Sequence, residues 1–78
     1  MHYAYILKCV DNSYYTGCTQ DLKQRLIKHQ NAEVESTKGK LPVELIFYCA
    51  FSDKYKAYNF QKYLKSGSGI AFRNRHLL

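Results

Sequence analysis

Residues 2–10 are mostly hydrophobic and are rich in aromatic and β-branched side chains, which predicts a β-strand. The residues on one side of such a strand are Tyr3, Tyr5, Leu7 and Cys9. After a polar turn, residues 13–18 are rich in tyrosine and threonine and predict a second strand. The short connection between them predicts a β-hairpin.

The register of this hairpin decides whether Tyr5 and Tyr15 share a face of the sheet. A two-residue turn at Asp11 and Asn12 places the two tyrosines on opposite faces. A three-residue loop with Asn12 in the left-handed conformation places them on the same face. Local chemistry allows either register, and the resemblance described below favours the shared face.

Apolar residues recur at helical spacing after the hairpin and predict a helix over residues 20–30. Leu22 and Leu26 lie about 40° apart around the helix axis and would form its buried stripe. Thr19 comes directly before the first turn, and its hydroxyl is a suitable N-cap.

Arg25 and His29 lie four residues apart, so they stack on adjacent turns at the edge of this stripe. An arginine in such a place can bind two phosphate oxygens at once and never loses its charge. Two simpler interpretations stay open. Arg25 can pair with Asp21 one turn earlier, and His29 can end the helix near its negative pole.

The second half of the chain predicts one strand and two helices. Residues 43–51 are apolar on both sides except at Glu44, which predicts a third strand, covered on both faces and central in the sheet. A second helix is predicted over residues 53–65 and a short basic helix over residues 70–76. The serines and glycines of residues 66–69 are expected to end the second helix.

A polar residue interrupts the apolar stripe of the second predicted helix. Ala57, Phe60 and Leu64 repeat at the spacing of a buried face, and Gln61 occupies the place between them. A buried amide without a partner costs on the order of 1 to 3 kcal/mol. Gln61 is therefore either bonded to backbone groups or placed there for another role.

Length and composition predict one globular domain of residues 1–78, with 46% hydrophobic residues. No apolar run approaches the roughly 18 residues that a membrane span needs, and no secretory signal is recognisable, so we expect a cytoplasmic protein without membrane contact. The three cysteines lack the spacing of a zinc site and are expected to act as small core residues.

The formal net charge is +6, and the whole excess lies in residues 54–78. This segment has no acidic residue and six basic ones: Lys54, Lys56, Lys62, Lys65, Arg73 and Arg75. Charge of one sign interleaved with aromatic residues favours a polyanion as partner, most often nucleic acid, although a solvated basic face gives the same pattern. Lys38 and Lys40 lie in a loop that either holds a phosphate backbone or is an ordinary connection.

Several short motifs occur in a fixed order along the chain. They are Ala4-Tyr5, Tyr15-Thr16-Gly17, Arg25 in the following helix, the polar Gln61 in a later helix, and the run YLKSGSG. Together they resemble the GIY-YIG nuclease family, in particular its small single-domain bacterial members, which are related to the nuclease module of the excision-repair endonuclease. The first motif is loose, since Tyr3 replaces its glycine and Ala4 its isoleucine.

The resemblance implies an α+β fold with a three-stranded antiparallel sheet flanked by helices, and a single Mg²⁺ or Mn²⁺ ion that assists phosphodiester hydrolysis. It places Tyr5 and Tyr15 at the tyrosines of the first and second motifs, Arg25 at the catalytic arginine, and His29 at a position that carries His or Tyr. Gln61 stands where the family has its metal-binding glutamate. Tyr5 could act as the base only beside cations that lower its pKa.

Gln61 weakens the expected metal site, because an amide oxygen lacks the negative charge that Mg²⁺ prefers. We therefore expect a metal-dependent endonuclease, of the kind used in DNA repair or recombination, with weakened activity. The alternative is a catalytically silent nucleic-acid-binding module. DNA is favoured over RNA, no protein partner is indicated, and recognition should be mainly of backbone or shape. The expected backbone contacts are Lys38, Lys40, Lys62, Lys65, Arg73 and Arg75.

Overall fold

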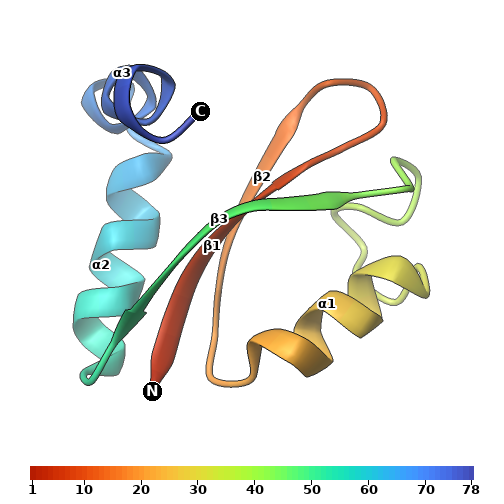
Figure 1. Ribbon diagram of the computed structural model, residues 1–78, viewed down its shortest axis with the longest axis horizontal. Helices are drawn as coiled ribbons and strands as arrows, with labels where there is room; N and C mark the ends of the chain where they lie inside the picture. Colours follow the sequence, from red (N-terminus) through yellow and green to blue (C-terminus); the bar gives the residue numbers. More distant parts are fainter.

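A three-stranded antiparallel sheet with the strand order β2-β1-β3 forms the middle of the molecule (Figure 1). The structure is a computed structural model that describes all 78 residues. The strands are β1 (His2–Lys8), β2 (Tyr14–Thr19) and β3 (Glu44–Phe51). The helices are α1 (Leu22–Gln30), α2 (Lys54–Leu64) and α3 (Gly67–His76). This architecture confirms the expected α+β fold.

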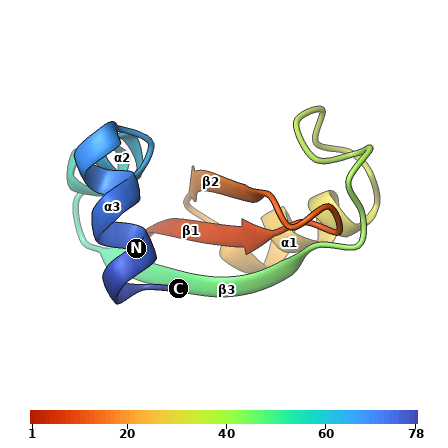
Figure 2. The ribbon, with the colours of Figure 1, turned by 90° about the horizontal axis from the view of Figure 1, so that it is seen from above.

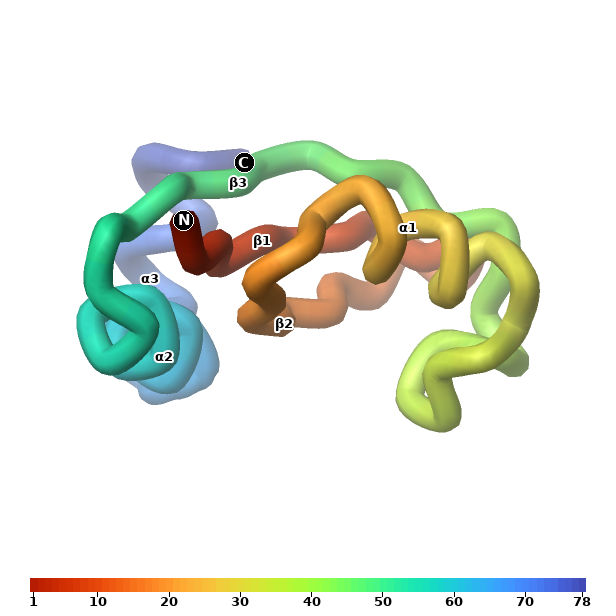
Figure 3. Tube along the Cα trace, turned by 90° about the horizontal axis from the view of Figure 1, so that it is seen from below, coloured from red at the N-terminus to blue at the C-terminus, as the bar shows by residue number.

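The sheet has helices on both faces. Figure 1 views it along the plane of its strands, with α1 on one side and α2 and α3 on the other. Figure 2 shows the strands side by side, and from below α1 lies in front of them (Figure 3). The odd-numbered residues of β1 face α1. Tyr5, Leu7 and the following Cys9 belong to a core cluster against which Leu22 and Leu26 of α1 pack. None of the three helices combines the length and apolar character of a membrane span.

The prediction that the third strand is central and covered on both faces was wrong. Strand β1 is central and pairs with both neighbours, and its residues Ala4, Ile6 and Leu7 are fully buried. Strand β3 lies at an edge, none of its residues is fully buried, and Tyr48 is 55% exposed. A continuous apolar run indicates neither how well a strand is covered nor which strand has neighbours on both sides.

The hairpin between β1 and β2 adopts the three-residue loop. Asn12 has a φ of 67°, and the Cys9 N–H donates a hydrogen bond of 2.8 Å to the carbonyl oxygen of Ser13. In this register Tyr5 faces Gly17 and Leu7 faces Tyr15 across the ladder. Because side chains alternate along a strand, both tyrosines lie on one face, as predicted.

Helix α1 begins two residues later than expected. Asp21 is its N-cap, and its carboxylate accepts a 3.0 Å hydrogen bond from the Gln24 N–H. The predicted cap, Thr19, instead accepts a bond from the Asp21 N–H at 3.1 Å. Both side chains are good caps, but a carboxylate also interacts favourably with the positive end of the helix dipole.

The segment between α2 and α3 is shorter than predicted, because α3 begins at Gly67. The Ser66 hydroxyl donates to the Tyr63 carbonyl at the end of α2 and accepts a 3.1 Å bond from the Gly69 N–H. A Cβ at Gly69 would overlap with the Tyr63 carbonyl. The glycine therefore does not stop a helix: it lets the first turn of α3 approach the last turn of α2.

Candidate active site

The candidate site is built around two buried side chains, Tyr5 and His29. The hydroxyl oxygen of Tyr5 lies 2.9 Å from Nε2 of His29, so strand β1 and helix α1 are joined by a hydrogen bond. The ring of Tyr15 lies beside both, with its centroid 6.2 Å from that of Tyr5 and 5.2 Å from that of His29. The structure thus brings together three of the four residues predicted as catalytic.

Gly17 leaves the space that the Tyr5 ring occupies. A Cβ at Gly17 would overlap with Cζ and the hydroxyl oxygen of Tyr5. This ring is only 1% exposed and is tied to His29, so it cannot move aside easily. The glycine of the Tyr-x-Gly motif is therefore needed for its missing side chain, and its backbone φ is not positive.

Arg25, the fourth predicted residue, is half-buried on α1 next to this group. Its positive charge lowers the pKa of His29, although burial is the larger cause. At Tyr5, burial raises the pKa well above the usual value, Tyr15 raises it further, and Arg25 opposes this only in part. A general base would need a lowered pKa, but the pKa of Tyr5 is raised, because the effect of desolvation outweighs that of the nearby Arg25 cation.

The simpler interpretation of Arg25 does not apply. Asp21 caps α1 and forms no ion pair, since the only salt bridge joins Lys38 to Glu35 at 2.9 Å. His29 does lie in the last turn of α1, as its simpler interpretation has it, but it is also fully buried and uses both ring nitrogens.

Thr37 is a member of this group that sequence reasoning missed. Its hydroxyl oxygen lies 2.7 Å from Nδ1 of His29, and its side chain is fully buried although it belongs to the loop between α1 and β3. The only available signal was indirect. A buried histidine needs partners for two ring nitrogens, and a threonine in a charged loop is one of several residues that can supply one.

The protons of this series of side chains can be assigned by counting donors. The Thr37 hydroxyl forms no other hydrogen bond, so as an acceptor from Nδ1 it would leave its own proton buried and unpaired. We therefore assign Thr37 as the donor to Nδ1, and Nε2 of His29 as the donor to Tyr5. Tyr5 then keeps its own proton, and the nearby phenol of Tyr15 also raises the pKa of Tyr5.

Gln61 is not part of this group. It faces the sheet from α2 together with Ala57 and Leu64, and α2 covers the face opposite to α1 (Figure 1). Gln61 is 7% exposed, and its oxygen Oε1 is buried without a hydrogen-bond partner. The simpler interpretation, an amide satisfied by backbone groups, does not hold for this oxygen.

Two polar hollows flank the group along the edge strand β2. One, of about 450 Å³, is lined at the end of β2 by Arg25, Lys28 and His2 among others. The other, of about 390 Å³, contains Tyr15 and three of the predicted backbone contacts, Lys40, Lys65 and Arg73.

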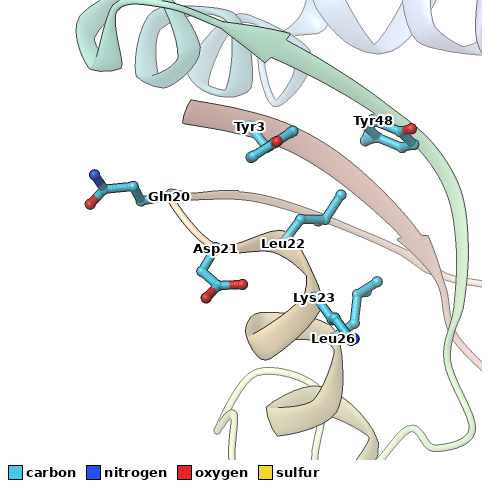
Figure 4. Close-up of a pocket in the computed structure, with 7 residues that line it drawn as sticks. All are labelled: Tyr3, Gln20, Asp21, Leu22, Lys23, Leu26 and Tyr48. Carbon is cyan, nitrogen blue, oxygen red and sulfur yellow. The ribbon is translucent and has the colours of Figure 1, made fainter. Parts of the chain in front are cut away.

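The remaining predicted backbone contacts, Lys38, Lys62 and Arg75, are exposed but line neither hollow. A larger hollow of about 720 Å³ lies between α1 and β3 (Figure 4). Its walls include Tyr3, Tyr48 and Leu26, and none of the predicted site residues lines it.

Comparison with known proteins gives consistent matches. The sequence model described as the GIY-YIG catalytic domain matches residues 1–70. The UPF0213 protein CPE1444 of Clostridium perfringens is 41% identical over 66 residues, which cover 83% of this chain and 71% of that protein. For the UPF0213 protein YazA of Bacillus subtilis the identity is 43% over 65 residues, covering 82% and 66%. The solution NMR structure of the UPF0213 protein BH0048 from Bacillus halodurans superimposes with a TM-score of 0.57 at 35% identity, covering 91% of this chain and 79% of that one.

The chain belongs to the GIY-YIG family. This confirms the resemblance drawn from the motifs, and the relatives are the small bacterial proteins that it suggested. The first motif matches the family pattern loosely, but its tyrosine, Tyr5, still lies in the candidate site. Ala4 is buried on the α2 face, Tyr3 lies beside Tyr48 at a ring distance of 6.2 Å, and Tyr5 points to the site.

GIY-YIG nuclease domains generally use a divalent metal ion, but this chain offers few ligands for one. Gln61, the metal ligand expected from the motifs, has only a neutral oxygen, and that atom is inaccessible. No group of three or more His, Cys, Asp or Glu side chains stands close enough to hold an ion. The residues present do not fit Mg²⁺ or Mn²⁺, which prefer charged oxygen ligands.

Proposed function

We propose that this GIY-YIG domain binds the backbone of nucleic acid along β2, with Arg25 and Tyr15 contacting phosphates in the two polar hollows. The observation that carries the proposal is the placement of these two half-buried side chains, one in each hollow, on either side of the hydrogen-bonded group of Tyr5, His29 and Thr37. A guanidinium binds two oxygens of one phosphate at once, and the phenol of Tyr15 can donate a hydrogen bond to another phosphate.

The buried residues act as a support for the Tyr15 contact. His29 holds Tyr5 by a hydrogen bond, and the rings of Tyr5 and His29 both pack against the ring of Tyr15. A phosphate that meets a preorganised donor pays less conformational entropy than one that must order it.

The charge on either side supports a chain of phosphates rather than a single anion. Lys28 lies in the hollow at one end of β2, and Lys40, Lys65 and Arg73 lie in the hollow at the other. Contacts of this kind act on the backbone and carry little sequence information. DNA and RNA both offer such a backbone, and DNA is the partner that we expect.

Hydrolysis of a phosphodiester is the second candidate function, favoured by family membership and by the grouping of Tyr15, Arg25 and His29. Arg25 would stabilise the negative charge that builds up on the phosphate, and Tyr15 would orient an oxygen. Tyr5 is unsuitable as the base, because it is buried and its pKa is raised. Without a charged ligand at Gln61, we expect binding to be readily measured and turnover to be slow or absent.

Fluorescence anisotropy with labelled single-stranded, duplex and branched oligonucleotides tests the binding proposal. Arg25→Ala should weaken binding by about 10- to 100-fold, as expected for a charge-assisted bidentate contact. Lys23→Ala removes the same charge from an exposed position on α1 and should change affinity less than twofold. Equal effects of the two substitutions, or no binding at low salt, would contradict the proposal.

A plasmid-nicking assay with Mg²⁺, Mn²⁺ or EDTA separates the two candidates. Nicking by the unaltered protein that is lost in Arg25→Ala would establish hydrolysis. Binding without nicking under every metal condition would support the binding function alone. The Arg25→Ala protein also controls for contaminating nucleases, which would be equally present in both preparations.

A further inference from the structure

A further hollow, called the third hollow below, lies on the other side of β2 and differs in character from the two polar ones. It has a volume of about 570 Å³ and is lined by Cys18, Lys54, Tyr55, Tyr58 and Asn59. Tyr55 and Tyr58 are one helical turn apart on α2 and are 67% and 51% exposed. Both rings are thus accessible to a ligand in this hollow.

The third hollow meets the phosphate-binding side of the molecule at one residue. Cys18 of β2 lines both the third hollow and the polar hollow that contains Arg25 and Lys28. Because β2 is an edge strand, no further strand separates the two hollows. A ligand can therefore pass around the edge of the sheet at Cys18 and occupy both.

We propose that the third hollow holds the base of an unpaired nucleotide whose phosphate lies in the polar hollow at Arg25. This proposal rests on the proposed function and names its substrate class, a single strand or an extruded nucleotide. The rings of Tyr55 and Tyr58 offer faces on which any base can stack. Asn59 adds an amide with both donors and an acceptor for the edge of the base.

Charge at the rim favours the same occupant. The Nζ atom of Lys54 lies 5.3 Å from the centroid of the Tyr55 ring, which places a cation beside the stacking surface. Asp53 caps the start of α2 and accepts a hydrogen bond from the Tyr55 N–H, and no acidic residue follows it along the helix. Stacking residues in a basic setting are typical of surfaces that bind single strands.

A continuous duplex does not meet these requirements. Its bases are paired and stacked on one another, so none can enter a hollow without being turned out of the helix. The phosphate contact alone does not distinguish the two substrates. The third hollow therefore predicts a preference for single strands that comes from the tyrosines and not from the charges.

Anisotropy titrations with a labelled single strand and its duplex test this preference. The double substitution Tyr55→Ala and Tyr58→Ala should weaken single-strand binding by roughly 5- to 150-fold, the range found for loss of one stacked base. Duplex affinity should stay within about twofold, since the charges are unchanged. Tyr48→Ala is the matched control, because Tyr48 is 55% exposed on β3, away from both hollows, and should change neither affinity.

A second pair of variants separates stacking from folding. Tyr58→Phe keeps the ring and should bind like the unaltered protein, whereas Tyr58→Leu keeps an apolar side chain without a ring and should lose affinity. Single-strand affinity that is insensitive to both tyrosines, with Arg25→Ala still weakening it, would overturn this inference and leave the phosphate proposal standing. Failure of every oligonucleotide to bind would overturn both.

Discussion

The two faces of the sheet treat their buried polar residues in opposite ways. On the α1 face, Thr37, His29 and Tyr5 are joined by two hydrogen bonds, and the half-buried Tyr15 packs its ring beside them. On the α2 face, Gln61 is buried with its oxygen unpaired. The first arrangement is preorganised for a ligand at its open end, whereas the second is an uncompensated cost.

This difference bears on the two parts of the proposed site. The groups proposed to bind and orient a phosphate contact one another, so a change in one should disturb the next. The proposed metal position depends on a single side chain, Gln61, whose oxygen forms no hydrogen bond. Substitutions on the two faces should therefore have opposite effects.

The largest effect is expected for Gly17→Ala, which acts on the α1 face. The added methyl group overlaps with a buried ring, so either Tyr5 leaves its bond to His29 or β2 shifts. Overpacking of this kind costs roughly 1 to 3 kcal/mol, and we expect the upper part of that range in urea denaturation. Gly39→Ala has no heavy atom within 4 Å of the new methyl group and should leave stability unchanged. A Gly17→Ala protein as stable as the Gly39→Ala protein would show that Tyr5 is not fixed.

An intermediate effect is expected for Thr37→Val, which keeps the shape of the side chain but removes its hydroxyl. Nδ1 of His29 would lose its only donor, at a cost of about 1 to 2 kcal/mol. Thr37→Ser should restore most of this stability. Nitrogen NMR of labelled histidine gives a second readout, because the unaltered protein should show His29 protonated at Nε2. Protonation at Nδ1 would contradict the donor assignment.

A smaller effect of the opposite sign is expected on the α2 face. Gln61→Leu removes an unpaired buried amide and should stabilise the protein by about 1 kcal/mol, measured by the urea midpoint. Nucleic-acid affinity should not change. Gln24→Leu, at an exposed position of α1, controls for a general gain from added apolar surface. A loss of stability in Gln61→Leu would mean that the amide is bonded after all and that this face has a second polar site.

The local sequence pattern predicted the helices and strands of this fold well, but it predicted their positions relative to one another poorly. The strand composition of β1 and the helical stripe of Leu22 and Leu26 were readable because each depends on residues close in sequence. The register at Asn12 was not decided by local pattern and was chosen from the family resemblance. The position of β3 at an edge was not readable, since it depends on how distant segments pair.

The candidate site shows the same division. Family motifs identified Tyr5, Tyr15 and His29, which the structure brings into contact. They did not indicate Thr37, because its contact with His29 depends on the path of an irregular loop. Nor could they indicate the direction of the pKa shift at Tyr5, which follows from how deeply the fold buries the phenol.

The smallest effect expected is a dependence of stability on pH that distinguishes the two faces. The pKa of His29 is lowered by burial and by Arg25, so the unfolded chain binds a proton more readily than the folded one. The contribution of His29 to the free energy of unfolding is therefore complete above about pH 6.5, the pKa of histidine in the unfolded chain. It is lost as the pH falls toward the lower pKa that His29 has in the folded protein. Urea midpoints measured from pH 7.5 to 5.5 should therefore decrease, whereas those of a His29→Gln protein should stay level. Gln61→Leu should keep the slope of the unaltered protein, because nothing on the α2 face contacts the imidazole, and a changed slope would mean that the two faces are coupled.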